Sequence, residues 1–124
     1  MSWRILIVDD SAVVRHSLRS CIEVNPTITV CGEAENGQVA IDKVKELKPD
    51  AVILDWQMPV MNGLEAARHI ARLAPKAAMV LLTLHSGDEL VKQARAVGIQ
   101  RVFSKSESLT HLVTCLTTMP SGCG

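Results

Sequence analysis

Short apolar runs alternate with longer mixed segments along the chain. The runs are mostly rich in Val, Ile and Leu, and polar residues seldom alternate with apolar ones inside them. Unbroken runs of this length are typical of strands that are covered on both faces, as in a parallel sheet. The pattern therefore predicts five buried strands, at Trp3–Val8, Thr27–Glu33, Ala51–Leu54, Ala78–Thr83 and Arg101–Ser104.

The segments between and after these runs show apolar residues at intervals of three and four. This spacing places the apolar residues on one face and predicts amphipathic helices. The sets are Val13, Val14, Leu18 and Cys21 or Ile22; Val39, Ile41, Val44 and Leu47; Leu64, Ala67, Ile70, Ala71 and Leu73 or Ala74; and Leu109, Leu112, Val113 and Leu116.

Capping residues mark several of the predicted helix ends. Pro49 ends the second helix, because the residue before a proline is disfavoured in a helix. Asn62 and Ser86 each precede a Glu by three residues, the spacing of a capping box at the start of a helix. Gly98 is expected just past the end of the fourth helix, where glycine accepts a left-handed conformation.

Repeated strand–helix units predict an α/β fold built on parallel strands with right-handed crossovers. The natural architecture is a doubly wound five-stranded parallel sheet with five helices, the last over Glu107–Thr118. We expect one domain over residues 1–119, followed by a short tail at 120–124. Sheets of this kind place their functional crevice at the carboxyl ends of the strands.

The composition narrows the class of protein. The 124 residues carry 13 basic and 13 acidic side chains, one Phe, two Trp and no Tyr. Without a basic excess or aromatic stacking residues, we expect no nucleic acid to bind this chain. No apolar run approaches the roughly 18 residues of a membrane span, and no signal-peptide pattern opens the chain. We therefore expect a cytoplasmic chain, with its four cysteines reduced.

Polar side chains stand at the ends of four predicted strands. Asp9 and Asp10 follow the first strand, and Asp55 ends the third. Thr83 ends the fourth, and Lys105 follows the fifth. A single aspartate after a strand is most often a solvated loop residue or a helix cap. Because the carboxyl ends of parallel strands share one edge, we expect all five side chains to meet and form a site.

The chemistry of this group favours phosphoryl transfer. Three neighbouring carboxylates repel one another, and Mg²⁺ would relieve the repulsion while leaving positions for phosphoryl oxygens. Asp55 is the candidate nucleophile, because carboxylates form aspartyl phosphates. Mg²⁺ would bridge Asp10, Asp55 and the phosphoryl group, while Thr83 and Lys105 bind phosphoryl oxygens. General acid–base catalysis has less support, since no histidine is placed as a relay.

Four stretches resemble the receiver domain of bacterial response regulators. They are "ILIVDDS", "LDWQMPVMNG", "LLT" and "FSKS", and their order and spacing fit that family along the whole chain. The resemblance implies a flavodoxin-like fold with strand order 2-1-3-4-5. It also implies a signalling switch that phosphorylates and slowly dephosphorylates itself, rather than an enzyme that turns over a substrate.

The same resemblance assigns roles to individual residues. Asp55 is the phosphoacceptor, charged by a sensor histidine kinase or a small phosphodonor. Asp10 is expected to bind Mg²⁺ directly and Asp9 through water, with the backbone carbonyl of Gln57 as the third protein ligand. Thr83 is the switch hydroxyl, and Lys105 binds the phosphoryl group.

Two positions depart from the common pattern of the family. The residue three before the lysine is usually Tyr, Phe or His, and here it is Val102. Phe103 is one place off, and alternation along a strand predicts that it faces the opposite side of the sheet. Leu84 follows the switch threonine, where small residues are common, and we expect it to narrow access to the acyl phosphate.

The sequence is compatible with several kinds of downstream output. "GEAENGQVAIDKVKELKPDAVILDWQMPVMNGLEAARHI" and "SKSESL" look most like receivers joined to a helix-turn-helix DNA-binding domain, which predicts transcriptional output. Phosphorylation would change the face made by the fourth helix, fifth strand and fifth helix, which would then bind a partner or form a homodimer. A stand-alone receiver and a phosphorylation-independent module are the alternatives. A phosphatase is disfavoured, because its D-x-D motif is missing.

Overall fold

Strands and helices alternate along the part of the chain that the computed structural model describes, which is residues 3–84, 87–105, 112, 114 and 116. The strands of this part are β1 (Trp3–Val8), β2 (Ile28–Ala34), β3 (Ala51–Asp55), β4 (Ala78–Thr83) and β5 (Arg101–Ser104). The helices with full bounds are α1 (Ala12–Ile22), α2 (Gly37–Leu47), α3 (Gly63–Leu73) and α4 (Asp88–Ala96). Each strand lies within one residue of its predicted bounds.

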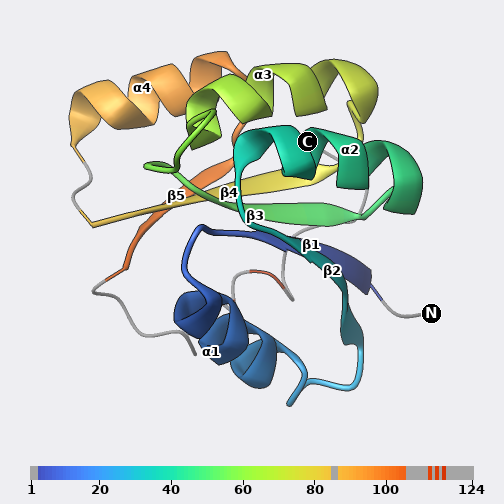
Figure 1. Ribbon diagram of the computed structural model, residues 1–124. Coiled ribbons are helices and arrows are strands. Elements are labelled where there is room, and N and C mark those ends of the chain that lie inside the picture. Colours follow the sequence, from blue (N-terminus) through green and yellow to red (C-terminus); the bar gives the residue numbers. More distant parts are fainter. Residues whose placement is uncertain (1–2, 85–86, 106–111, 113, 115, 117–124) are drawn as a thin grey trace.

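The strands form one parallel sheet in the order β2-β1-β3-β4-β5, which confirms the predicted architecture. Helix α1 covers one face, and α2, α3 and α4 cover the other (Figure 1). The register pairs Val8 with Leu54 and Asp55 with Leu82, so the carboxyl ends of the three central strands lie level with one another.

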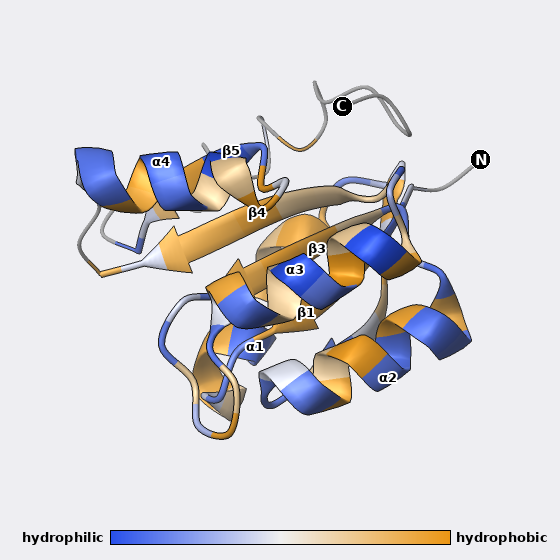
Figure 2. Cartoon of the chain, turned by 90° about the horizontal axis from the view of Figure 1, so that it is seen from above, coloured by the Kyte–Doolittle hydropathy of each residue, from blue (hydrophilic) through white to orange (hydrophobic). Residues whose placement is uncertain are grey.

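The core is divided by the sheet into two apolar layers. Side chains such as Leu6, Val52 and Leu81 pack toward α2, α3 and α4. Their strand neighbours, such as Ile7 and Ile53, pack toward α1. Figure 2 shows the strands as predominantly hydrophobic and the helices as amphipathic. Both faces are therefore buried, which explains why the strands read as unbroken apolar runs.

The fifth helix, predicted over Glu107–Thr118, falls mostly on residues outside the described part. Leu112, Thr114 and Leu116 are helical, and Leu112 and Leu116 are buried in the same layer as α1. Cys115 and Cys123 also lie outside the described residues. Cys21 and Cys31 are free thiols, each half-buried, and burial raises the pKa of Cys31.

Polar residues cap three of the helices as simple side-chain chemistry predicts. Asn62 Oδ1 accepts a hydrogen bond from the Glu65 backbone N–H at 2.9 Å, which confirms that α3 begins with an N-cap at Asn62. Ser11 and Asn36 cap α1 and α2 in the same way. The prediction for α4 was wrong by one residue, because the N-cap is Gly87 rather than Ser86.

Two further details bear on the helix predictions. Gly98 has a φ of 99°, and the backbone N–H groups of Gly98 and Ile99 close the end of α4, as predicted. Val13 was expected on the inner face of α1 but is 75% exposed, while Leu18 and Ile22 are buried. Within the described residues, no helix has the length and apolar character needed to cross a membrane.

Candidate functional site

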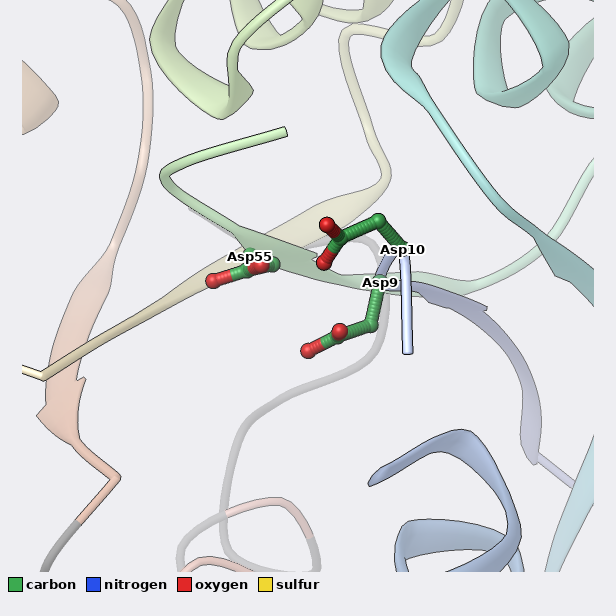
Figure 3. Close-up of side chains that lie close together, drawn as sticks. All are labelled: Asp9, Asp10 and Asp55. Carbon is green, nitrogen blue, oxygen red and sulfur yellow. The ribbon is translucent and has the colours of Figure 1, made fainter. Parts of the chain in front are cut away.

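Three carboxylates converge at the carboxyl edge of the sheet. Asp9 and Asp10 follow β1, and Asp55 is the last residue of β3. One ligand oxygen from each lies within 4.8 Å of the others. Figure 3 shows the three side chains grouped at this edge. Asp9 and Asp55 are only 1% and 4% exposed, whereas Asp10 is exposed. The neighbouring central strands therefore create the cluster, as the sequence predicted.

Lys105 brings the opposite charge to the cluster. Its Nζ lies 2.9 Å from Asp55 Oδ1 and 3.2 Å from Asp9 Oδ2. The Lys105 backbone N–H donates to the Thr83 carbonyl at 2.7 Å, which ties the residue to the end of β4. One ammonium thus faces two buried carboxylates, so the site carries a net negative charge when all its groups are ionised.

The pKa values of Asp55 and Lys105 reflect this charge distribution. Burial raises the pKa of Asp55, and the charges of Asp9 and Asp10 add to the rise, while Lys105 opposes it. Burial alone would lower the pKa of Lys105, but its hydrogen bond to Asp55 and the charge of Asp9 outweigh burial and raise that pKa. The ammonium is therefore held in its charged form, and the Asp55 carboxylate is incompletely neutralised.

The atom Asp9 Oδ2 is the clearest sign that a cation fits here. It is buried, and it has no hydrogen bond from any residue that the structure describes. Its nearest cation is the Lys105 ammonium, whose Nζ forms an ion pair with it at 3.2 Å. A buried oxygen with an open lone pair, beside two other carboxylates, is a donor set that Mg²⁺ prefers. Asp9, Asp10 and Asp55 would hold the ion.

A pocket of about 190 Å³ opens beside the cluster. It gives a small group access to Asp55 from solvent. Its lining contains Asp10, Asp55 and Lys105 together with Trp56, Gln57, Thr83 and Leu84. All the predicted site residues except Asp9 therefore line it. Leu84 is 65% exposed at its edge. The structure thus brings the predicted residues together at one edge of the sheet.

The loop after Asp55 is tightly built. A Cβ on Gly63 would lie 2.4 Å from the Asp55 carbonyl oxygen, so only glycine permits α3 to begin this close to the acid. Within the loop, the Met61 N–H donates to the Pro59 carbonyl at 2.7 Å, and the intervening Val60 has a φ of 69°. A γ-turn with positive φ is rare and strained, especially at a β-branched residue.

Val102 and Phe103 face opposite sides of the sheet, as alternation predicted. Val102 packs against the layer of α2, α3 and α4, and Phe103 is buried in the layer of α1. The side of β5 that faces α4 therefore presents the short aliphatic side chain of Val102.

Arg15 is a component of the site's surroundings that the sequence analysis missed. Its guanidinium Nη1 donates to the Asp9 carbonyl at 2.6 Å. A signal was present in the sequence, because Arg15 lies one turn into a helix, near the end where the helix dipole disfavours a cation. A basic residue near the start of a helix is expected to have a specific hydrogen-bond acceptor, and here the Asp9 carbonyl is such an acceptor.

Comparison with known proteins identifies the class that this fold and site define. Residues 5–117 match the family of the response regulator receiver domain, and the chain belongs to that family. It is similar to the transcriptional regulatory proteins LnrK and YdfI of Bacillus subtilis, with 34% and 40% identity over 96% and 87% of this chain. The matched regions make up 54% and 52% of those two proteins, so the chain spans about half their length.

Solved structures agree with this assignment. A LuxR-family two-component response regulator from Aurantimonas superposes with a TM-score of 0.89 at 32% identity, covering 94% of this chain and 84% of that one. The response regulator domain of Thermotoga maritima CheB gives 0.85 at 30% identity, covering 94% and 92%. Receiver domains are signalling switches, and among the relatives of this one are both transcription regulators and protein-glutamate methylesterases.

Proposed function

We propose that this receiver domain accepts a phosphoryl group on Asp55 in a reaction that depends on Mg²⁺. One observation carries the proposal. The Asp55 carboxylate lines a pocket, with the Lys105 ammonium and two further carboxylates close beside it. This arrangement supplies the nucleophile, the cation for the phosphoryl oxygens and the ligands for a metal ion, which are the parts that phosphoryl transfer requires.

The chemical step forms one bond and breaks another. An oxygen of the Asp55 carboxylate attacks phosphorus, and the bond from phosphorus to the donor's leaving group breaks with its electron pair on that group. The product is an acyl phosphate on Asp55. When bound, Mg²⁺ would neutralise charge on the carboxylates and on the phosphoryl oxygens. Beside the carboxylates, the backbone carbonyl of Gln57, a residue of the pocket lining, is a proposed protein ligand of the ion.

Two residues would respond to the new group. The Lys105 ammonium, which now contacts Asp55 Oδ1, would transfer to a phosphoryl oxygen. The Thr83 hydroxyl, on the pocket wall, would donate to another phosphoryl oxygen. Because the segment from Leu84 leads to α4, which begins at Asp88, movement of Thr83 would change the surface formed by α4, β5 and the predicted fifth helix. The phosphoryl group adds roughly two negative charges to drive this change.

The receiver family and its transcription-regulator relatives support a proposal for the donor and the output. We infer that a sensor histidine kinase or a small phosphodonor in the cytoplasm charges Asp55. The similarity to LnrK and YdfI supports transcriptional control through a segment outside this chain, with homodimerisation or partner binding as the intermediate step. We infer that this chain itself is a switch without substrate turnover, even though some relatives join a receiver to a methylesterase.

The test is phosphorylation of the purified chain with a small phosphodonor and Mg²⁺, followed by intact mass. We expect one added phosphoryl group, lost in Asp55→Asn and after removal of Mg²⁺ with a chelator. The matched control is Asp42→Asn, an exposed aspartate on α2, which should accept the group normally. A phosphoryl group added to the Asp55→Asn variant would exclude Asp55 as the acceptor. Many turnovers of phosphodonor per chain would instead favour a phosphatase.

A further inference from the structure

Arg15 connects the acidic cluster to the neighbouring strand. Its Nη1 donates to the Asp9 carbonyl at 2.6 Å, and its Nε donates to Glu33 Oε1 at 2.9 Å. The side chain is only 17% exposed although it carries a charge. A guanidinium is a planar fork of donors, so contacts to two acceptors fix its orientation. Arg15 is therefore a rigid link between β2 and the residue that follows β1.

The polar groups of Asp9 are almost completely fixed by the chain. Its backbone N–H donates to the Ala34 carbonyl at 3.0 Å, and its own carbonyl accepts from Arg15. Its Oδ1 accepts from the Ser11 backbone N–H at 2.9 Å. Only Oδ2 has no hydrogen bond from the described residues, and this oxygen lies toward Lys105 and the cluster. Both the backbone and the carboxylate of Asp9 are thus held in one orientation.

Glu33 anchors the guanidinium and balances its charge. Glu33 Oε2 accepts a second hydrogen bond, from Arg19 Nε at 2.9 Å. Although partial burial opposes ionisation, these hydrogen bonds and the charges of Arg19 and Arg15 lower the pKa of Glu33, which keeps it ionised at neutral pH. The positive charge of Arg15 is therefore countered on the side away from the metal ligands.

We propose that Arg15, anchored by Glu33, is a positioning residue that holds Asp9 with Oδ2 directed at the metal ion. The proposal rests on the proposed function, because it concerns the same Mg²⁺ site. Arg15 does not touch the ion or the reacting atoms, and it acts only through the Asp9 carbonyl. Residues that orient metal ligands typically contribute 10- to 100-fold to metal affinity.

If Arg15 acted only through its charge, its removal would change Mg²⁺ affinity in the opposite direction. The sign of the change in affinity therefore tests the proposal. A cation near a metal site repels the ion, so removal of the Arg15 charge would strengthen Mg²⁺ binding if charge were its only influence. If Arg15 orients Asp9, its removal weakens binding instead. Arg19 provides the matched control, because it has the same charge and the same Glu33 partner, while its ion pairs are to Glu23 and Glu33 and not to Asp9.

The experiment measures the dissociation constant for Mg²⁺ from the emission of Trp56, which lines the pocket, at constant ionic strength. All variants carry Trp3→Phe, because Trp3 lies at the other end of β1 and would add background. We expect Arg15→Gln to bind Mg²⁺ about 10-fold more weakly. Arg15→Lys keeps the charge but cannot span both acceptors, and it should also bind more weakly. Arg19→Gln should bind as tightly as the parent chain or slightly more so.

The outcomes separate this inference from the function it rests on. Thermal unfolding without Mg²⁺ establishes that each variant is folded at the assay temperature, and Arg15→Lys decides the question if Arg15→Gln does not fold. Unchanged affinity in Arg15→Lys, or tighter binding in Arg15→Gln, overturns the positioning role. Equal weakening in Arg19→Gln overturns it too. If the parent chain itself binds no Mg²⁺, the proposed function fails instead.

Discussion

Asp55 is an acid in surroundings that disfavour its charge. Burial, Asp9 and Asp10 all raise its pKa, and Lys105 opposes them only partly. A raised pKa means that the folded chain binds the proton more tightly than the unfolded chain does. The ionised carboxylate therefore lowers the stability of the metal-free protein as pH rises from the ordinary value of 3.8 through the higher folded value. The group that gives the site its chemistry thus reduces the free energy of unfolding.

The unfavourable charge of Asp55 predicts a pH-dependent difference in stability. At pH 7 without Mg²⁺, Asp55→Asn should unfold at a higher temperature than the parent chain, because a neutral isostere replaces an unfavourable charge. The difference should shrink as pH falls toward 3.8, because the raised pKa makes the carboxyl more protonated in the folded state than in the unfolded state. Thermal unfolding across a pH series measures it, with Asp42→Asn as the control. If the parent chain is instead more stable than Asp55→Asn at pH 7, the attraction of Lys105 outweighs the cost of burying the Asp55 charge.

The junction of β3 and α3 shows how elements position the acid. The Gly63 N–H donates to the Trp56 carbonyl at 2.8 Å, and the Trp56 N–H donates to the Leu82 carbonyl at 2.9 Å. The loop therefore closes on itself and is also tied to β4. This closure needs α3 to begin against the Asp55 carbonyl, where no Cβ fits. The start of α3 and the position of Asp55 are consequently set by one contact.

Gly63→Ala tests that contact. The added methyl would overlap the backbone oxygen of Asp55, so α3 or Asp55 must shift, at a cost of about 1–3 kcal/mol in the free energy of unfolding. Phosphoryl acceptance should fall as well, because the nucleophile moves. Chemical denaturation and intact mass measure the two effects. The control is Gly87→Ser, where nothing lies within 4 Å of the new Cβ and a hydroxyl can cap α4. Equal stability of both variants would contradict the close approach.

Elements were easier to predict than the links between them. The runs at β1, β4 and β5 gave the bounds of those strands, because a strand buried on both faces leaves an unbroken apolar signal. The meeting of Asp9, Asp10 and Asp55 followed from strand order alone. Arg15 could not be paired from sequence, since its contact with Glu33 depends on how α1 lies beside β2. The outward turn of Val13 depends on the same packing.

At the scale of the whole molecule, the site joins segments from both halves of the chain. Asp9 and Asp10 come from the start, Asp55 from the middle, and Lys105 from after the last strand of the sheet. An unfolded chain cannot hold these groups together. Any ion that binds all three acids therefore stabilises the folded state as a whole, by an amount that depends on its concentration relative to its dissociation constant.

Mg²⁺ should consequently raise global stability. At 100 times the dissociation constant, we expect the free energy of unfolding to rise by about 2.7 kcal/mol. Asp10→Asn should lose most of this gain, because it removes one ligand oxygen from the cluster. Denaturant titrations with and without Mg²⁺ measure the gain, with NaCl at equal ionic strength as the control. An equal gain from NaCl, or an undiminished gain in Asp10→Asn, would mean that the ion binds elsewhere.

The γ-turn at Val60 has a consequence for how this sequence can change. A non-glycine residue in such a conformation typically costs about 1–3 kcal/mol, and Val60 is 80% exposed, so little burial offsets that cost. A population of variants selected only for resistance to unfolding would drift toward Gly or Asn at this position. Retention of valine under selection for signalling would show that its isopropyl group, a few residues after Asp55, is used in recognition.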